Sequence, residues 1–174
     1  GRVRIPEFQR GLRWQRKDVL RLFDSIVRGY PIGSLLLWKR PAPAAHVHIG
    51  VLEIDAPEYP EALWVVDGQQ RLSSLACALH DAGQSDPRFA LAYDLAGRRF
   101  DQPREGRGHL IPLPVLYDLQ RLLRWVRDHP EVDELFDEAT RVAKLIRQYK
   151  VPAYIVKQSD EQVLRDIFDR MNNF

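Results

Sequence analysis

The chain has 174 residues, of which 45% are apolar and 29% are charged, as in one soluble domain or a domain and a half. Its single cysteine, Cys77, excludes an intrachain disulfide and a cysteine-rich zinc site, and it fits a reducing cytoplasm. No apolar run approaches the roughly 20 residues that span a bilayer, and no signal peptide is visible. We therefore expect a cytoplasmic protein with no membrane partner.

The small net charge of +2 hides an uneven distribution along the chain. Residues 1–40 carry ten lysines and arginines against three acids, which is a local charge of +7. Such a basic excess favours an anionic partner, either a nucleotide or a nucleic acid. A solvated helix face, balanced by acidic surface elsewhere, explains the same excess equally well.

The first half of the chain alternates between helical and strand-like patterns. Gly29 and Pro31 end the first helix, and Pro41-Ala-Pro43 breaks the first of three strands. An extended segment is predicted at 4–6 and a helix at 15–28. Three strands at 34–38, 46–54 and 63–66 follow, and then a second helix at 69–79.

The second half begins with a hairpin around Ala96-Gly97 and then becomes more helical. Two short strands are predicted at 89–95 and 98–100, followed by an exposed loop at 101–109. Two helices at 113–127 and 132–148, a strand at 151–156 and a last helix at 160–172 complete the prediction. We expect an α+β core with a mixed sheet over 1–109, followed by a mainly helical segment over 110–174. Because the chain starts at Gly1 rather than Met and ends within the last helix, we interpret it as part of a longer protein.

Several familiar catalytic and phosphate-binding motifs do not occur in the sequence. There is no Gly-x-x-x-x-Gly-Lys-Ser/Thr loop, no Gly-x-Gly-x-x-Gly and no Gly-x-Ser-x-Gly. Cys77 lies within an apolar helical pattern and is better explained as a buried small residue than as a nucleophile. His46 and His48 share one strand face, but two ligands without a nearby third rarely form a metal site.

The stretch VVDGQQRLSSL, Val65 to Leu75, carries the most chemistry. Gly68 permits a tight reversal from strand to helix, and Gln69, Gln70 and Arg71 then occupy the first turn. Backbone N–H groups at a helix N-terminus lack intrahelical partners and attract phosphates. Arg71 adds a bidentate fork exposed to the ligand, so its loss should cost little stability.

Asp67 is the unusual member of this stretch, because a carboxylate repels a phosphate. The conflict disappears if Asp67 holds Mg²⁺ or positions water. The alternative is purely structural: Asp67 caps the helix, Gly68 makes the turn, and the glutamines and arginine are solvated. The stretch by itself leaves both interpretations open.

Four motifs in one order resemble the N-terminal domain of GmrSD-type restriction endonucleases and the related phosphorothioate-sensing SspE proteins. They are IPEFQRGLRW (Ile5–Trp14), LFDSIVRGYPIGSLLLW (Leu22–Trp38), VVDGQQRLSSL (Val65–Leu75) and IFDRMNN (Ile167–Asn173). The order of elements also resembles the ParB and sulfiredoxin fold. The resemblance covers nearly the whole chain and implies a ParB-like nucleotide-binding core.

The resemblance implies that a nucleoside triphosphate (NTP) faces Asp67, Gln70 and Arg71, with Asp67 and Gln70 as the catalytic pair. Gly68 and Gln69 would line the site, Arg10 would reach the phosphates from the other side, and Asn172 would close it. Mg²⁺ would bind Asp67. Family members use nucleotide binding or hydrolysis to license a nuclease against modified phage DNA.

This fragment carries no His-Asn-His pattern, and the resemblance puts the nuclease in a C-terminal domain that is missing here. We expect DNA to be contacted through the full-length protein. The predicted function is therefore an NTPase regulatory domain of a DNA-modification-dependent restriction enzyme. The rival is a ParB-like DNA-binding or adaptor module that hydrolyses nothing, and a third interpretation makes the motif purely structural.

Overall fold

A computed structural model describes residues 2–6, 12–104, 109–157 and 161–172. The chain forms two compact units that interleave along the sequence. The sheet unit comprises Gly1–Arg13, Gly33–Ser73 and Val151–Phe174, and the helical unit comprises Trp14–Ile32 and Ser74–Lys150. The boundary at residue 109 stays a prediction about where the nucleotide-binding part ends. Among the described helices, none is both long and apolar enough to cross a membrane.

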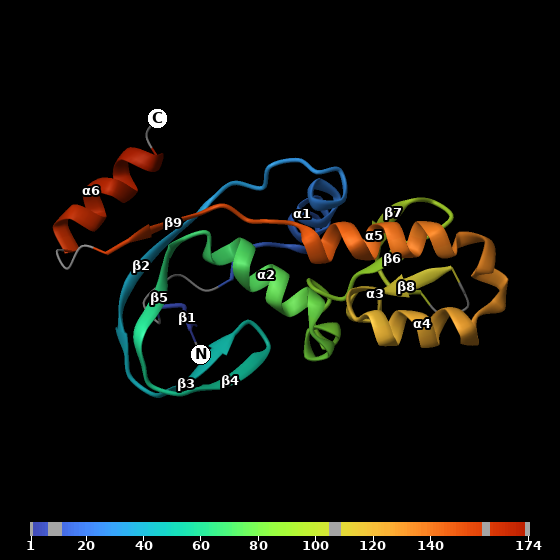
Figure 1. Ribbon diagram of the computed structural model, residues 1–174, viewed down its shortest axis with the longest axis horizontal. Helices are drawn as coiled ribbons and strands as arrows, with labels where there is room; N and C mark the ends of the chain where they lie inside the picture. Colours follow the sequence, from blue (N-terminus) through green and yellow to red (C-terminus); the bar gives the residue numbers. More distant parts are fainter. Residues whose placement is uncertain (1, 7–11, 105–108, 158–160, 173–174) are drawn as a thin grey trace. The chain divides into compact units, whose positions relative to one another are not determined.

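The sheet unit contains a four-stranded mixed sheet in the order β1-β5-β2-β9 (Figure 1). Strand β5 runs parallel to β1 and antiparallel to β2, which in turn runs parallel to β9. This sheet, with the helices, confirms the predicted α+β class. The strands and the final helix α6 are β1 Val3–Arg4, β2 Leu35–Ala42, β5 Tyr59–Asp67, β9 Ala153–Val156 and α6 Glu161–Asn172.

Strand β2 is longer than the predicted 34–38, and the prediction that Pro41-Ala-Pro43 breaks it was wrong for Pro41 and Ala42, which both lie in the strand. The strand continues through Pro41 to Ala42, which pairs with Tyr59. The register shifts between Arg40 and Ala42. A proline has no N–H to donate to the ladder, and such an irregularity is where a strand tolerates it.

The single strand predicted at 46–54 was wrong, because this segment is a hairpin. Strand β3 (Ala45–Ile49) pairs antiparallel with β4 (Leu52–Ala56). The chain reverses at Gly50, whose φ of +61° lies in the left-handed region that favours glycine. Apolar and polar residues alternate along two paired strands in the same way as along one strand. The alternation therefore did not reveal the turn.

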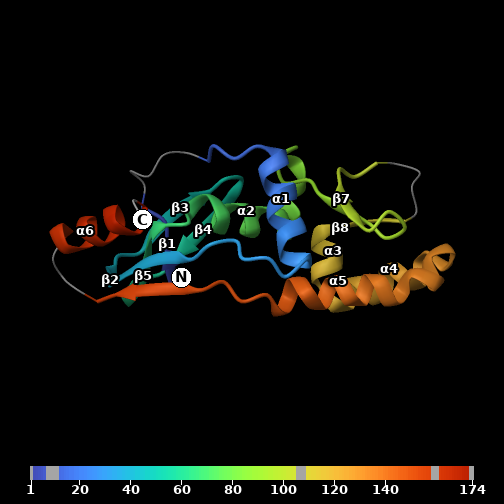
Figure 2. The ribbon, with the colours of Figure 1, turned by 90° about the horizontal axis from the view of Figure 1, so that it is seen from above.

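The helical unit consists of helices and a small sheet (Figures 1 and 2). Its buried apolar side chains include Phe23, Phe89 and Leu122. Helix α1 fits the predicted 15–28, and the hairpin around Ala96-Gly97 is confirmed by strands β6 and β7. Strand β8 also pairs with β6. The elements are α1 Arg16–Val27, η1 Asp81–Ser85, β6 Ala92–Asp94, β7 Arg99–Asp101, β8 Leu110–Pro112, α3 Leu113–Tyr117, α4 Leu119–Asp128, η2 Pro130–Leu135 and α5 Phe136–Gln148.

The single helix predicted at 113–127 is two helices, α3 and α4, which meet at Asp118. Asp118 has extended backbone, and its carboxylate accepts the N–H groups of Gln120 and Arg121 at 2.9 and 3.0 Å. An aspartate at this position caps the next helix, so the side chain of Asp118 favours a new helix start here over a continuous helix. The predicted 132–148 helix likewise starts as the 3₁₀ turn η2 before α5.

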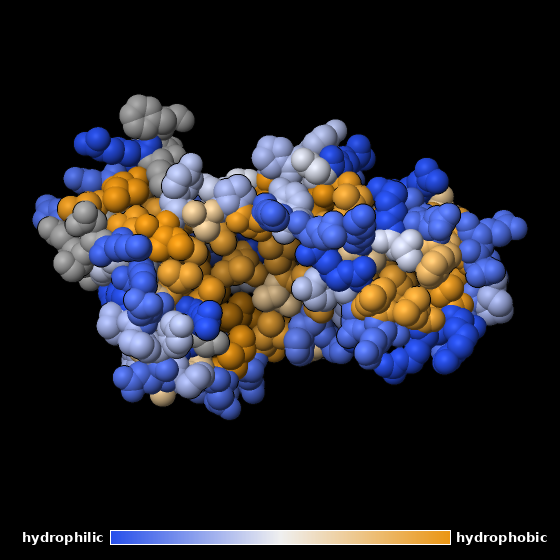
Figure 3. Space-filling view, viewed as in Figure 1, coloured by the Kyte–Doolittle hydropathy of each residue, from blue (hydrophilic) through white to orange (hydrophobic). Residues whose placement is uncertain are grey.

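Buried side chains of the helical unit include one polar pair. The Tyr93 hydroxyl donates to Glu138 Oε1 at 2.7 Å, and burial raises the pKa of Tyr93. Arg141 contacts both oxygens of Glu138, at 2.9 and 2.7 Å. Cys77 is fully buried, as predicted for a small apolar residue. Other apolar residues stay exposed on α4, notably Leu119 and Leu123. Figure 3 shows an orange surface patch in the region of α4.

Helix α2 (Gln69–Leu79) is the element that carries the predicted site. It starts in the sheet unit, directly after β5, and its later residues belong to the helical unit. The predicted helix at 69–79 is therefore confirmed. Its first turn is the part that matters for function, because it lies beside the ends of β5 and β2.

Candidate functional site

The strand-to-helix corner is formed by Asp67, Gly68 and Gln69. Gly68 has a φ of +92°, and a Cβ built on it would lie 2.3 Å from Leu35 Cδ2. Both the backbone angle and the lack of space favour glycine, which confirms the predicted tight reversal. Because the helix begins at Gln69, Gly68 holds the N-cap position and Asp67 precedes it.

The Arg71 side chain folds back from α2 across the ends of two strands. Its Nη2 donates to the carbonyl oxygen of Ser34 at 2.6 Å and to Asp67 Oδ2 at 3.0 Å. The Arg71 side chain is 20% exposed and that of Asp67 is 41% exposed. The guanidinium therefore has structural partners as well as access to solvent, and its loss is expected to cost more stability than the sequence suggested.

Asp67 and Arg71 consequently form an ion pair four residues apart across the corner. This pairing accounts for a carboxylate in this turn without a bound ligand, since the charges of Asp67 and Arg71 offset each other. It differs from the structural alternative raised by the sequence, in which Asp67 caps the helix and Arg71 is solvated. The roles of both residues in ligand binding stay predictions.

Gly33 is a part of the corner that sequence reasoning missed. Its φ is +86°, and a Cβ built on it would lie 2.3 Å from Arg71 Nη1 and 3.2 Å from Arg71 Cζ. The next residue, Ser34, supplies the carbonyl that Arg71 contacts. The sequence did contain a signal for it. Gly33 lies four residues after Gly29, beyond the helix C-terminus, so it had to serve a separate turn.

Gln70 links the corner to the N-terminal segment. The backbone N–H of Arg13 donates to Gln70 Oε1 at 2.8 Å. This bond places the amide of Gln70 beside the end of a segment that contains Arg10, although Arg10 itself lies outside the described residues. Asn172 is the last residue of α6, and its side chain is also outside the description. The structure therefore brings together Asp67, Gly68, Gln69, Gln70 and Arg71.

The predicted Mg²⁺ ligand, Asp67, stands as one carboxylate. Among the described residues, no group of three or more His, Cys, Asp or Glu side chains could hold a metal ion. Mg²⁺ is commonly bound through one or two carboxylates together with substrate phosphates. One carboxylate is compatible with such an ion, and Asp67 as a Mg²⁺ ligand stays a prediction.

His46 and His48 do share a face of β3, with ring centroids 5.1 Å apart. His46 Nδ1 lies 2.6 Å from Asp55 Oδ1, and this hydrogen bond raises the pKa of His46. His48 Nδ1 lies 3.9 Å from Glu53 Oε1. All four side chains are at least half exposed, so these pairs are surface contacts between the two strands of the hairpin.

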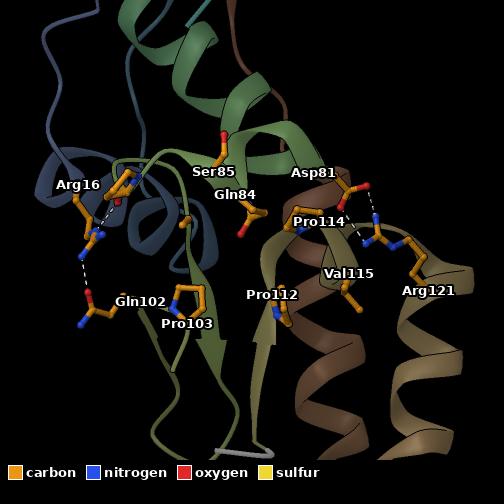
Figure 4. Close-up of a pocket in the computed structure, with 12 residues that line it drawn as sticks. Arg16, Asp81, Gln84, Ser85, Gln102, Pro103, Pro112, Pro114, Val115 and Arg121 are labelled. Atoms are coloured by element: carbon orange, nitrogen blue, oxygen red, sulfur yellow. Dashed lines mark hydrogen bonds and ion pairs between the residues drawn. The ribbon is translucent and has the colours of Figure 1, made fainter. Parts of the chain in front are cut away.

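A pocket of about 550 Å³ lies within the helical unit, and none of the predicted site residues that the structure describes lines it (Figure 4). Prolines form much of its lining. At one end Arg16 contacts Gln102, and at the other Arg121 donates to both oxygens of Asp81 at 2.9 Å (Figure 4). Its arginines therefore already have protein partners, and the pocket itself identifies no ligand.

The corner offers one carboxylate, one guanidinium and two carboxamides. These groups bind and orient phosphates and water, and none of them is an activated nucleophile. The fold and the corner together define a class of protein: an α+β domain with an arginine-bearing turn between a central strand and a helix.

A comparison with known protein families shows which family within this class the chain belongs to. A model of the GmrSD restriction endonuclease N-terminal domain matches residues 1–174, and the chain belongs to this family. The uncharacterized protein MJ0686 of Methanocaldococcus jannaschii is 34% identical over 157 residues. These residues are 86% of this chain, which spans 22% of the length of that curated relative.

Proposed function

We propose that this chain is the nucleotide-binding regulatory domain of a DNA-modification-dependent restriction endonuclease that acts in phage defence. Its ligand is a nucleoside triphosphate, and it hydrolyses that ligand slowly or only within the full-length protein. Membership of the GmrSD family supports the restriction context. We also propose that the sheet unit is a ParB-like core and that a nuclease in the full-length protein acts on DNA.

The observation that carries this proposal is the placement of Arg71 in the first turn of α2. Its Nη2 donates to both Ser34 and Asp67, and the side chain keeps 20% of its surface exposed. A guanidinium held in place loses less entropy when it binds a phosphate. The helix N-terminus adds backbone N–H groups and a favourable dipole for the same anion.

Binding requires an exchange of partners at Arg71. A phosphate oxygen replaces Asp67 Oδ2 at Nη2, while the Ser34 carbonyl keeps the guanidinium in position. Asp67, no longer paired with Arg71, would then be available to hold Mg²⁺, which would neutralise phosphate charge. The ion pair of the free protein is thus the resting arrangement of the site.

The other predicted residues complete this site. Gln70 would orient the attacking water with Asp67, and Gln69 and Gly68 would contribute backbone N–H groups to the phosphates. Arg10, three residues before the Arg13 that contacts Gln70, would bind phosphate from the N-terminal segment. Asn172 would close the site from α6.

Replacement of Arg71 tests the proposal. Arg71→Ala should weaken triphosphate binding about tenfold or more, because a hydrogen bond to a charged group contributes roughly 1.5–3 kcal/mol. Loss of the contacts to Ser34 and Asp67 should also lower the free energy of unfolding by about 1–2 kcal/mol. Isothermal titration with ATP, GTP, CTP and UTP, each with and without Mg²⁺, measures the affinity.

The chain provides a matched control in Arg28. Arg28 forms an ion pair with Asp24 at the same spacing of four residues, with 2.8 Å between Nε and Oδ2, but it lies in the helical unit. Arg28→Ala removes the same charge and the same type of pair and should leave nucleotide affinity unchanged. Equal affinities in wild type and a folded Arg71→Ala protein contradict the nucleotide site.

One observation favours the DNA-binding alternative. The guanidinium of Arg40 lies over the rings of Trp38 and Trp64, with its Cζ 4.6 and 5.2 Å from their centroids. Arg40 is exposed while both tryptophans are half-buried, and an exposed guanidinium stacked on aromatic rings can bind a phosphate of a nucleic acid backbone. In this alternative the sheet unit contacts duplex DNA through such arginines and uses no nucleotide.

A further inference from the structure

We propose that Gly33 is a positioning residue for the nucleotide site, because its lack of a side chain leaves room for the Arg71 guanidinium beside the start of β2. This inference rests on the proposed function. It adds to the site a residue that lies 38 positions from Arg71 in sequence and outside the Asp-Gly-Gln-Gln-Arg stretch.

The first support is steric. A Cβ on Gly33 would approach Arg71 Nη1 to 2.3 Å, which is shorter than any ordinary contact between these atoms. The obstructed atom is the far end of a flexible side chain, so the arginine would swing away and the backbone would keep its course. An alanine at position 33 therefore removes Arg71 from its place without removing Arg71 from the protein.

The second support is the backbone conformation. The φ of +86° at Gly33 directs the chain so that the Ser34 carbonyl meets Arg71 Nη2 at 2.6 Å. The following residue, Leu35, donates its N–H to the Pro152 carbonyl at 2.8 Å and begins β2. The carbonyl that holds Arg71 is thus anchored to the sheet, and Gly33 makes the turn just before it.

The third support is that two glycines meet at the same guanidinium. A Cβ on Gly68 would lie 3.0 Å from Arg71 Nη2 and 3.4 Å from Nε, while one on Gly33 would meet Nη1. Both glycines have positive φ. The guanidinium therefore fits between two positions that each lack a side chain, and this fit fixes the direction in which it is presented to a phosphate.

Gly29→Ala is a matched control for Gly33→Ala. Gly29 also has a positive φ, +71°, but a Cβ built on it meets nothing within 4 Å. Both substitutions carry the backbone penalty of a left-handed alanine, and only Gly33→Ala displaces Arg71. Nucleotide affinity should fall about tenfold in Gly33→Ala, as in Arg71→Ala, and stay within about twofold of wild type in Gly29→Ala.

The double variant Gly33→Ala/Arg71→Ala separates positioning from direct binding. If Gly33 acts through Arg71, the double variant binds the triphosphate as weakly as Arg71→Ala and no more weakly. The measurement is isothermal titration of the full-length protein with ATP, GTP, CTP and UTP in the presence of Mg²⁺. Unchanged affinity in Gly33→Ala, or additive losses in the double variant, overturns the inference.

Thermal unfolding distinguishes failure of this inference from failure of the proposed function. Absence of nucleotide binding in the wild type refutes the function. The role of Gly33 is then judged from stability: the cost of Gly33→Ala should exceed that of Gly29→Ala, and this excess should disappear when Arg71 is alanine. A Gly33→Ala protein that does not fold, and that Arg71→Ala does not rescue, also overturns the inference.

Discussion

Arg71 joins two backbone segments of the sheet unit through a single nitrogen atom. Its Nη2 contacts the Ser34 carbonyl before β2 and the Asp67 carboxylate at the end of β5. A side chain with such contacts supports the local fold, whatever it binds. A stability loss in Arg71→Ala is therefore expected and does not by itself argue against a nucleotide site, so affinity must be measured on folded protein.

Asp67→Asn separates the charge of Asp67 from its shape. Asparagine keeps the size and an oxygen that accepts from Arg71, so the melting temperature should change little. Metal-free nucleotide binding should be retained or strengthened, because Arg71 no longer has an anionic partner that competes with phosphate. The Mg²⁺-dependent part of the affinity, and hydrolysis by the full-length protein, should be lost. Titrations with Mg²⁺ and with EDTA measure both parts.

Asp24→Asn is the control for this experiment. It removes a carboxylate that pairs with Arg28 in the same way but lies in the helical unit, so its Mg²⁺ response should equal that of wild type. Two results would rule out a catalytic role for Asp67. One is an unaltered Mg²⁺ response in Asp67→Asn, and the other is full hydrolysis by the full-length variant.

At the scale of elements, helix α5 is tied to strand β6 through Glu138. This carboxylate accepts from the Tyr93 hydroxyl and from Arg141, and its side chain is only 7% exposed. The hydrogen bond from Arg141 holds the pKa of Glu138 below its ordinary value of 4.5, while burial opposes the shift. The ionised form therefore stabilises the native state.

Glu138→Gln should lower the free energy of unfolding at pH 7 by about 1–2 kcal/mol, because the charge-assisted bond to the half-exposed Arg141 is lost. Since the native pKa is depressed, this stabilisation is fully present above the ordinary value of 4.5 and is lost as the pH falls through the native pKa. Denaturant unfolding at pH 7, 5, 4 and 3 should show the gap between variant and wild type closing only at acidic pH.

The exposed Glu134, on the 3₁₀ turn η2, provides the control for Glu138. Glu134→Gln should have nearly the same stability as wild type at every pH. A constant gap between Glu138→Gln and wild type from pH 7 to pH 3 would contradict the linkage argument and assign the stability loss to packing.

At the scale of the whole molecule, the proposed function predicts coupling between nucleotide and DNA. In the full-length protein, a triphosphate with Mg²⁺ should change DNA affinity or DNA cleavage, and Arg71→Ala should abolish that change. Basal duplex affinity should remain in the variant, because it depends on other cationic residues. Fluorescence anisotropy with labelled duplex, over a range of salt concentrations, measures the affinity.

The DNA-binding alternative predicts a different pattern in the same titrations. Duplex affinity would fall steeply with salt, nucleotides would have no effect, and Arg40→Ala would reduce the salt slope by about one. Wild-type protein that behaves in this way would contradict nucleotide control and favour the adaptor function.

The sequence by itself determined the family and the local character of the corner. The helix α1, the reversal at Gly68 and the start of α2 follow from short-range rules, because apolar spacing and glycine act over a few residues. The hairpin at 45–56 and the break at Asp118 were missed because their patterns fit more than one structure. Two paired strands can have the same apolar sequence pattern as one strand, and two adjacent helices can have the same pattern as one helix.

Only the tertiary structure decided what surrounds Arg71. Gly33, Ser34 and Arg13 reach the corner because β2 pairs with β5 and because the N-terminal segment contacts Gln70. No spacing rule connects residues that lie 37 or 57 positions apart. The interleaving of the two units has the same origin, since strand pairing depends on which surfaces can be buried together and not on distance along the chain.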